Sequence, residues 1–208
     1  MAKLKKQHMT IHWKAIVQDD SSIPATEATL KEKATLVGRI GLMMLSVGTG
    51  AWRVRNSMNK VARCLGITCT ADIGLLAISY TCIEGTDTYT QSISNPTTGV
   101  NTHKLMQLEL FMKEFPDKVS TYSVKHIHEV LDEIQKLPAN YKAWNLGLAS
   151  ALACGAFTFL LGGGPVEMCC AFLGAGVGNF VRKKMLGHSI SLLANVAVSV
   201  AASCLVYV

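Results

Sequence analysis

Residues 144–164 read WNLGLASALACGAFTFLLGGG, and this stretch separates two parts of the chain that differ in composition. Between Lys142 and Arg182 the only Asp, Glu, Lys or Arg is Glu167, and residues 186–208 contain none of these four types. Nearly all of the charge therefore lies in residues 1–142. A helix that crosses a bilayer needs about 20 predominantly apolar residues. The contrast predicts a polar domain followed by an α-helical membrane domain.

Three apolar stretches make up the predicted membrane domain, residues 141–208, and we interpret each as one membrane span. They cover about 143–162, 165–181 and 188–208. The basic residues between the second and third stretch are Arg182, Lys183 and Lys184. Because positively charged loops face the cytoplasm, this is the pattern of a multi-pass protein of the cell membrane with a cytoplasmic N-terminal domain. Since the chain ends inside an apolar stretch, we expect it to be a fragment or to need partner helices. A buried soluble helix bundle is the alternative.

The N-terminal part has the pattern of a small α+β domain at residues 27–140, preceded by a mobile tail at 1–26. Thr29 and Glu32 have the spacing of a capping box, which predicts a helix start, and a second helical pattern covers 52–66. Thr, Ile and Tyr are frequent in 67–99, which favours a small antiparallel sheet. Helical spacing returns in 101–116 and 120–138. The predicted order is α-α-β-β-β-α-α.

Composition and motifs argue against several classes of function. The net charge is +6, but the basic residues are dispersed and no nucleic-acid signature accompanies them, so no nucleic-acid partner is predicted. The seven cysteines form no C-x-x-C pair, and we expect them to be reduced. His126 and His128 point in different directions on a helix, so neither a metal nor a cofactor is predicted. No signal peptide or catalytic motif is present, and the chain is not predicted to be an enzyme.

Polar residues recur every four positions in the third apolar stretch: Ser191, Asn195, Ser199 and Ser203. This spacing places them on one slowly drifting helix face, which we call the polar stripe. Two interpretations stay open, namely hydrogen bonds between helices and the lining of a path for a polar substrate. Glu167 follows Pro165 at the start of the second stretch. It either interacts with the positive end of that helix or acts as a gate that meets the substrate.

Small residues in the apolar stretches predict close contacts between helices. Gly147, Ala151 and Gly155 are spaced by four, and Gly174 and Gly178 form a G-x-x-x-G motif. Small side chains let helix backbones approach closely. The pattern indicates a packed bundle and no particular function.

Two segments of the N-terminal domain resemble motifs of the threonine/serine exporter family. Residues 48–67, GTGAWRVRNSMNKVARCLGI, are similar to a Gly-rich turn, an aromatic residue, Arg-Val and a helix that ends in Leu-Gly. Residues 98–105, TGVNTHKL, are similar to a Gly-hydrophobic-Asn segment before a helix. The matching positions are Gly48, Trp52, Arg53, Val54, Gly66, Gly99, Asn101 and His103, and the glycines at 162–164 are also similar. Where many members carry carboxylates, this chain has Gly50 and Arg55.

The resemblance implies a cytoplasmic domain and a multi-helix transport domain that exports threonine, serine or a related small polar metabolite, driven by an ion gradient. Some members are split, with a large subunit of this type working beside a smaller membrane protein, and such relatives are linked to dicarboxylate export. Membrane lipid, a smaller membrane subunit or a second copy, and a small polar substrate are thus the expected partners. A membrane-anchored hydrolase-like domain and a regulatory or scaffold protein are the alternatives.

Arg53 begins a predicted helix, where the helix dipole does not favour a cation. We therefore expect a partner carboxylate and a structural role, with Asp72 as the candidate partner. Asp72, His103 and Glu109 are the polar residues nearest the predicted sheet and its exit.

Overall fold

The computed structural model describes residues 13, 23–75, 77–94, 99–138, 142–185 and 192–207. The chain divides into two compact units, Met1–Pro138 and Ala139–Val208. The elements of the first unit are α2 (Leu30–Ser46), α3 (Ala51–Cys64), β1 (Thr68–Ile73), β2 (Ala77–Glu84), β3 (Asp87–Ser94), α4 (Thr102–Lys118) and α5 (Val124–Lys136). Their order is the predicted α-α-β-β-β-α-α. Most of the predicted tail, 1–26, lies outside the described residues, but Ala25 is buried and its N–H donates to the Tyr122 carbonyl at 2.9 Å.

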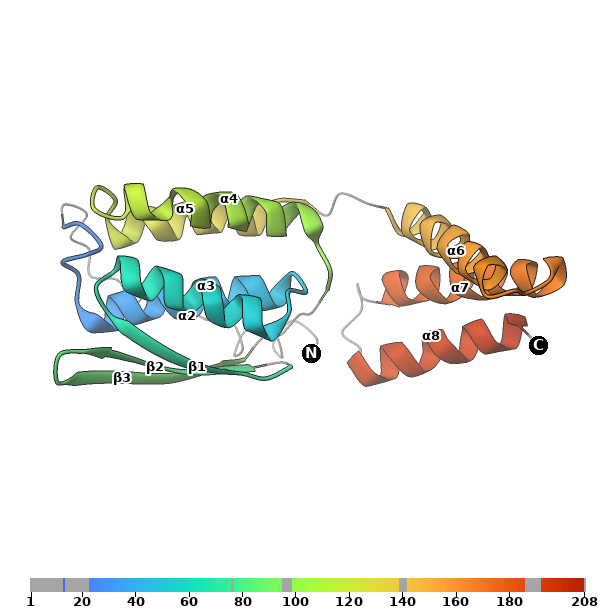
Figure 1. Cartoon of the computed structure of the whole chain (residues 1–208), viewed down its shortest axis with the longest axis horizontal. Helices are drawn as coiled ribbons and strands as arrows, with labels where there is room; N and C mark the ends of the chain where they lie inside the picture. Colours follow the sequence, from blue (N-terminus) through green and yellow to red (C-terminus); the bar gives the residue numbers. More distant parts are fainter. Residues whose placement is uncertain are drawn as a thin grey trace, which may run out of the picture. The chain divides into compact units, whose positions relative to one another are not determined.

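The first unit has three layers, with α2 and α3 between the sheet and the pair α4 and α5 (Figure 1). The sheet is antiparallel with strand order β1-β2-β3. Because α2 lies in the middle layer, it is buried along nearly its whole length, and its apolar side chains form the centre of the core. Gly38 of α2 faces Tyr80 of β2, and a Cβ at this position would overlap the Tyr80 hydroxyl. Glycine here lets the helix approach the sheet closely.

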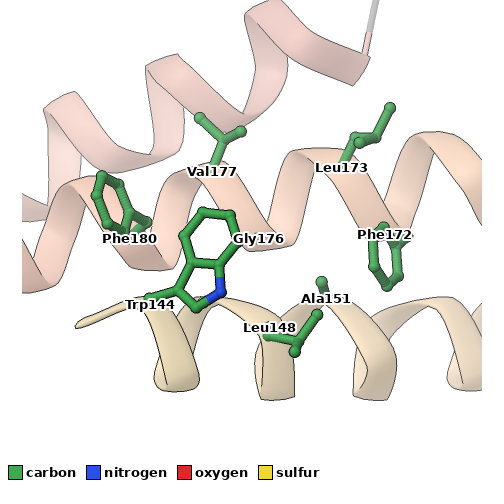
Figure 2. A pocket seen from close by; sticks show the side chains of 9 residues that line it. Trp144, Leu148, Ala151, Phe172, Leu173, Gly176, Val177 and Phe180 are labelled. Carbon is green, nitrogen blue, oxygen red and sulfur yellow. The ribbon is translucent and has the colours of Figure 1, made fainter. Parts of the chain in front are cut away.

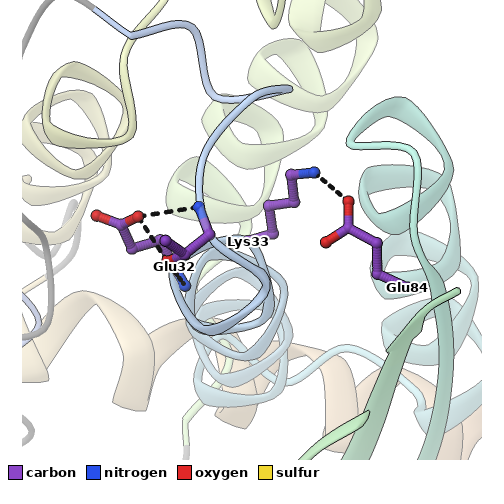
Figure 3. A network of polar contacts seen from close by, with 4 residues as sticks. Glu32, Lys33 and Glu84 are labelled. Carbon is purple, nitrogen blue, oxygen red and sulfur yellow. Dashed lines mark hydrogen bonds and ion pairs between the residues drawn. The ribbon is translucent and has the colours of Figure 1, made fainter. Parts of the chain in front are cut away.

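The start of α2 confirms the predicted capping box. The Thr29 hydroxyl accepts from the Glu32 N–H at 3.4 Å, and the Glu32 carboxylate accepts from the Thr29 N–H at 3.1 Å. The next residue, Lys33, is buried and its ammonium group lies 2.5 Å from the carboxylate of Glu84 at the end of β2 (Figure 3). The first turn of α2 is therefore both capped and tied to the sheet.

A buried polar cluster joins α2 to α5. Arg39 is 1% exposed, forms an ion pair with Asp132, and donates to the carbonyl oxygen of His128 at 3.0 Å. Burial lowers the pKa of Arg39, and the hydrogen bond and charge of Asp132 oppose that change. His128 is buried beside Arg39, whereas the half-exposed His126 ring packs edge-on against Tyr122. The two histidines thus lie on different sides of α5.

The second unit consists of α6 (Ala143–Leu160), α7 (Pro165–Met185) and α8 (Leu192–Tyr207), with α7 in contact with both other helices. The predicted membrane domain with three spans is wrong. In the parts of the chain that the structure describes, no helix combines the length and the apolar character needed to cross a bilayer.

The lengths and ends of the three helices explain this correction. The 16 residues of α8 rise about 24 Å and the 18 residues of α6 about 27 Å, less than the roughly 30 Å of a hydrocarbon core. The 21 residues of α7 carry Glu167 in the first turn and Arg182, Lys183 and Lys184 in the last. The fold over the described residues is seven helices with a small three-stranded sheet.

Candidate functional site

The two family-like segments lie against each other in the first unit. The Asn101 N–H donates to the Val47 carbonyl at 3.1 Å. Gly48 has a φ of +85°, and a Cβ there would lie 3.2 Å from the Cα of Val100, so only glycine fits both the conformation and the space. The Asn101 side chain accepts from the Lys104 N–H at 3.1 Å and so caps α4. These contacts join the turn between α2 and α3 to the start of α4.

The other motif residues lie on α3, just after it, and in the first turn of α4. Val54 points into the core and is fully buried, whereas Trp52 on the same turn of α3 is exposed. His103 lies in the first turn of α4. Gly66, which ends the motif, has a φ of +74° directly after α3. Among the matching positions, Val54 therefore belongs to the core, and the others lie at the surface or are half-buried.

Arg53 forms an ion pair with Glu109 of α4 and not with Asp72, the predicted partner. The structure thus brings together two of the residues singled out from the sequence, while Asp72 lies at an exposed position of β1. The Arg53 and Glu109 side chains are 43% and 44% exposed. Ion pairs with this exposure contribute little to stability because water and salt screen them.

A hollow of about 220 Å³ lies beside this ion pair, and we call it the α3–α4 hollow. Its lining residues are Met44 from α2, then Trp52, Arg53, Asn56, Ser57 and Lys60 from α3, and Glu109, Met112 and Lys113 from α4. The polar members on α3 are spaced by three or four residues and share one helix face. Sequence reasoning found Trp52, Arg53 and Glu109 but missed the others. The signal that could have found them is this polar spacing on the motif helix.

In the second unit the polar stripe of α8 is partly buried against the bundle. Asn195 is 2% exposed, and its amide donates to the Arg182 carbonyl of α7 at 3.4 Å. The Ser199 hydroxyl donates to the Asn195 carbonyl at 2.8 Å, and the Ser203 hydroxyl donates to the Ser199 carbonyl at 3.0 Å. In the described part of the chain the Asn195 side-chain oxygen has no hydrogen-bond partner. Ser191 lies outside the described residues.

Glycines lie where the three helices approach most closely. Gly178 faces α8, and a Cβ there would overlap the Ser203 hydroxyl. Gly174, one turn earlier on α7, is also buried. On α6, a Cβ at Gly147 would lie 3.2 Å from the Gly176 carbonyl oxygen of α7, and one at Gly155 would lie 3.6 Å from Met168.

Apolar side chains of α6 and α7 line a groove of about 270 Å³. Figure 2 shows Trp144 of α6 beside Phe180 of α7, and Phe172 of α7 pointing toward Ala151 of α6, along this groove. Many apolar side chains of the second unit are exposed, so much of its surface is hydrophobic. Surfaces of this kind mark contacts with a membrane or with partner proteins.

Glu167 is exposed in the first turn of α7, next to the turn at 162–164 that follows α6. A carboxylate at this position is favoured by the positive end of the helix. Its assignment as a gate stays a prediction.

Removing the Arg53 side chain is expected to change stability little. This replaces the expectation that Arg53 has a structural role. Arg53→Ala should lower the free energy of unfolding of the full chain by less than about 1 kcal/mol, since the pair is half exposed. Urea unfolding followed by circular dichroism measures the change, with Arg63→Ala on the same helix as the control. A loss of several kcal/mol would show that Arg53 supports the fold.

Comparisons with known proteins bear on both units. The model of a family described as "Putative threonine/serine exporter" matches residues 35–208, a range that includes both motif segments, the α3–α4 hollow and α6 to α8. Neither the curated proteins nor the solved structures provided a match. The family is one of membrane transporters and not of enzymes, so it implies association with a membrane and a small substrate. Because the match spans well over half of the 208 residues, the chain belongs to the threonine/serine exporter family.

Proposed function

We propose that this chain is a subunit of an exporter of small polar metabolites, with threonine and serine as substrates and an ion gradient as the driving force. The observation that carries the proposal is the family match over residues 35–208. The exposed apolar side chains of α6 to α8 support it, because lipid or partner helices would cover such a surface. A smaller membrane subunit or a second copy of the chain would complete the transport path.

We place the first unit on the cytoplasmic side of the cell membrane. Cys69 of β1 and Cys82 of β2 are directly opposite in the antiparallel register, and both are free thiols. An oxidising compartment favours disulfides, whereas the cytosol keeps thiols reduced. We expect both thiols to stay reduced, which suits a cytosolic location.

The polar stripe is the part of the proposed transport path that this chain contributes. Asn195 and Ser199 are its most buried described members, and the oxygen of the Asn195 side chain is an unpartnered acceptor on a helix that carries no charged residue. A substrate ammonium or hydroxyl group that has lost its water could donate to this oxygen. Ser203 extends the same face along α8, Ser191 belongs to the stripe by its spacing in the sequence, and Glu167 is the candidate gate at the start of α7.

The function can be tested in cells that accumulate the substrate. Cells loaded with threonine-containing dipeptides should release threonine faster when they express the chain together with its membrane partner than when they do not. Serine and succinate, measured in the same cells, distinguish amino-acid export from dicarboxylate export. Equal release of all three solutes with and without the chain would contradict the proposal.

Substitutions in the polar stripe distinguish a role in the transport path from a role in helix packing. Asn195→Leu should lower threonine efflux per molecule of folded protein about fivefold, the effect of losing roughly one hydrogen bond to the substrate. Ser199→Ala should have a smaller effect, because its hydroxyl already donates to backbone carbonyls of α8. Val200→Leu, at an exposed position of the same helix, is the matched control. Unchanged efflux per molecule in Asn195→Leu would leave the stripe with a packing role only.

A further inference from the structure

Two polar contacts between α3 and α4 lie at the two ends of the α3–α4 hollow. At one end Arg53 pairs with Glu109, and at the other the ammonium group of Lys60 donates to the Met112 carbonyl at 2.9 Å. Asn56 and Ser57 lie on α3 between Arg53 and Lys60, on the face that lines the hollow. Hydrogen-bonding groups therefore converge on one space from both helices.

The charge around the hollow is unbalanced. Three cations line it, namely Arg53, Lys60 and Lys113, against the single carboxylate of Glu109. The excess is thus two positive charges. Arg53 already pairs with Glu109, and the charge of Lys113 also acts on the neighbouring Glu114. Lys60, with part of the charge of Lys113, therefore makes up the positive excess, and a ligand with a negative group is favoured there.

The floor of the hollow is apolar and its size is small. Met44 and Met112 are buried at its base, and the exposed Trp52 ring stands at its rim. A volume of about 220 Å³ is below the 300–1,000 Å³ or so of pockets for drug-sized ligands. An apolar base with a few convergent polar groups is the usual construction of a small-molecule site.

We infer that the α3–α4 hollow is a binding site for a small metabolite that carries a carboxylate. The ligand carboxylate accepts hydrogen bonds from Lys60 and Lys113, and the amide of Asn56 or the hydroxyl of Ser57 bonds a ligand hydroxyl. An α-amino acid would also direct its ammonium group to Glu109, whereas a dicarboxylate would meet repulsion there. The site lies in the first unit and does not depend on the transport path. Only the choice of threonine, serine and succinate as probes rests on the proposed function.

Isothermal titration of the purified full chain with threonine, serine and succinate tests this inference. Lys113→Met and Lys60→Met should each weaken binding about tenfold, as expected for the loss of a charge-assisted hydrogen bond. Lys136→Met on α5, another exposed lysine, is the matched control and should bind as the unmodified chain does. Lys113 is exposed on its helix, so its replacement should leave the unfolding temperature unchanged, and this is measured on the same samples.

Glu109→Gln identifies the ligand class. If the ligand is an amino acid, this change should weaken binding about tenfold, because the ammonium group loses its partner. If the ligand is a dicarboxylate, the same change should strengthen binding, since repulsion is removed and Arg53 is released. Either result supports a carboxylate site. The inference is overturned if none of the three probes binds, or if binding is the same in Lys113→Met, Lys60→Met and the unmodified chain. Because binding is measured without transport, failed efflux with intact binding would count against the proposed function alone.

Discussion

Arg39→Ala should lower the free energy of unfolding of the first unit by about 3 kcal/mol, the low end of the range for breaking a buried ion pair. Arg39 is almost completely buried and joins α2 to α5 through Asp132 and the carbonyl of His128. Alanine would leave both partners without this donor and would create a cavity between the layers. The low end applies because the Asp132 side chain is 27% exposed and water can reach it. Urea unfolding of the full chain, followed by circular dichroism, measures the loss.

Arg39→Lys distinguishes the charge of Arg39 from its shape, and Arg55→Ala is the control for loss of an exposed arginine. Arg39→Lys keeps the charge but loses the planar fork that reaches Asp132 and His128 together, so it should recover only part of the stability. Arg55→Ala removes an exposed arginine of α3 that donates to the Ala71 carbonyl, and it should cost less than about 1 kcal/mol. Equal stability of Arg39→Ala and Arg55→Ala would contradict the assignment of Arg39 to the core.

Gly178→Leu should prevent α7 and α8 from packing as they do in the structure. Even the first carbon of a side chain at this position would overlap the Ser203 hydroxyl and lie 3.1 Å from the Ser199 carbonyl oxygen. Extra atoms in a packed contact typically cost about 1–3 kcal/mol, and leucine adds far more than one methyl group. Thermal unfolding of the full chain in detergent should show a clearly lower transition temperature for the second unit.

A compensating change tests whether Ser203 is the group that Gly178→Ala displaces. Gly178→Ala alone should destabilise the unit, and adding Ser203→Gly should recover much of the loss, because the overlapping hydroxyl is gone. Ala201→Leu, at an exposed position of α8, should have little effect and serves as the control. If Gly178→Leu unfolds at the same temperature as the unmodified chain, then α7 and α8 do not meet at this glycine.

Local patterns in the sequence predicted local structure well. The spacing of Thr29 and Glu32 indicated the capping box, and the Thr-rich and Ile-rich segment formed the three predicted strands. These features depend on neighbours in the sequence, so the chemistry of a few residues determines them. The same holds for Asn101, which lies within its family-like segment and caps α4.

Contacts between elements far apart in the sequence could not be predicted in this way. Periodicity shows which residues share a helix face but not which carboxylate lies opposite, so Asp72 was chosen for Arg53 where the structure has Glu109. His128 is buried because α2 brings Arg39 to that side of α5, a contact that the spacing of His126 and His128 does not indicate. The α3–α4 hollow was missed for the same reason, since two of its polar side chains, Glu109 and Lys113, come from a helix that lies far from α3 in the sequence.

The error in the second unit has a different cause. The count of uncharged residues gave the lengths of the apolar stretches, which differ from the lengths of the helices. In the predicted third span, for example, α8 covers only Leu192–Tyr207. On α7 the charged residues at 167 and 182–184 lie within the helix and not in flanking loops. Hydropathy alone does not define where a helix begins and ends.

Efflux from proteoliposomes tests the proposed function most directly. The purified full chain, together with its membrane partner where one is needed, is reconstituted with radiolabelled threonine inside, and an ion gradient is imposed across the lipid. The proposal predicts threonine release that saturates with concentration, depends on the gradient and is reduced by Asn195→Leu. Release no faster than from protein-free liposomes, with the gradient present and the partner supplied, would contradict it.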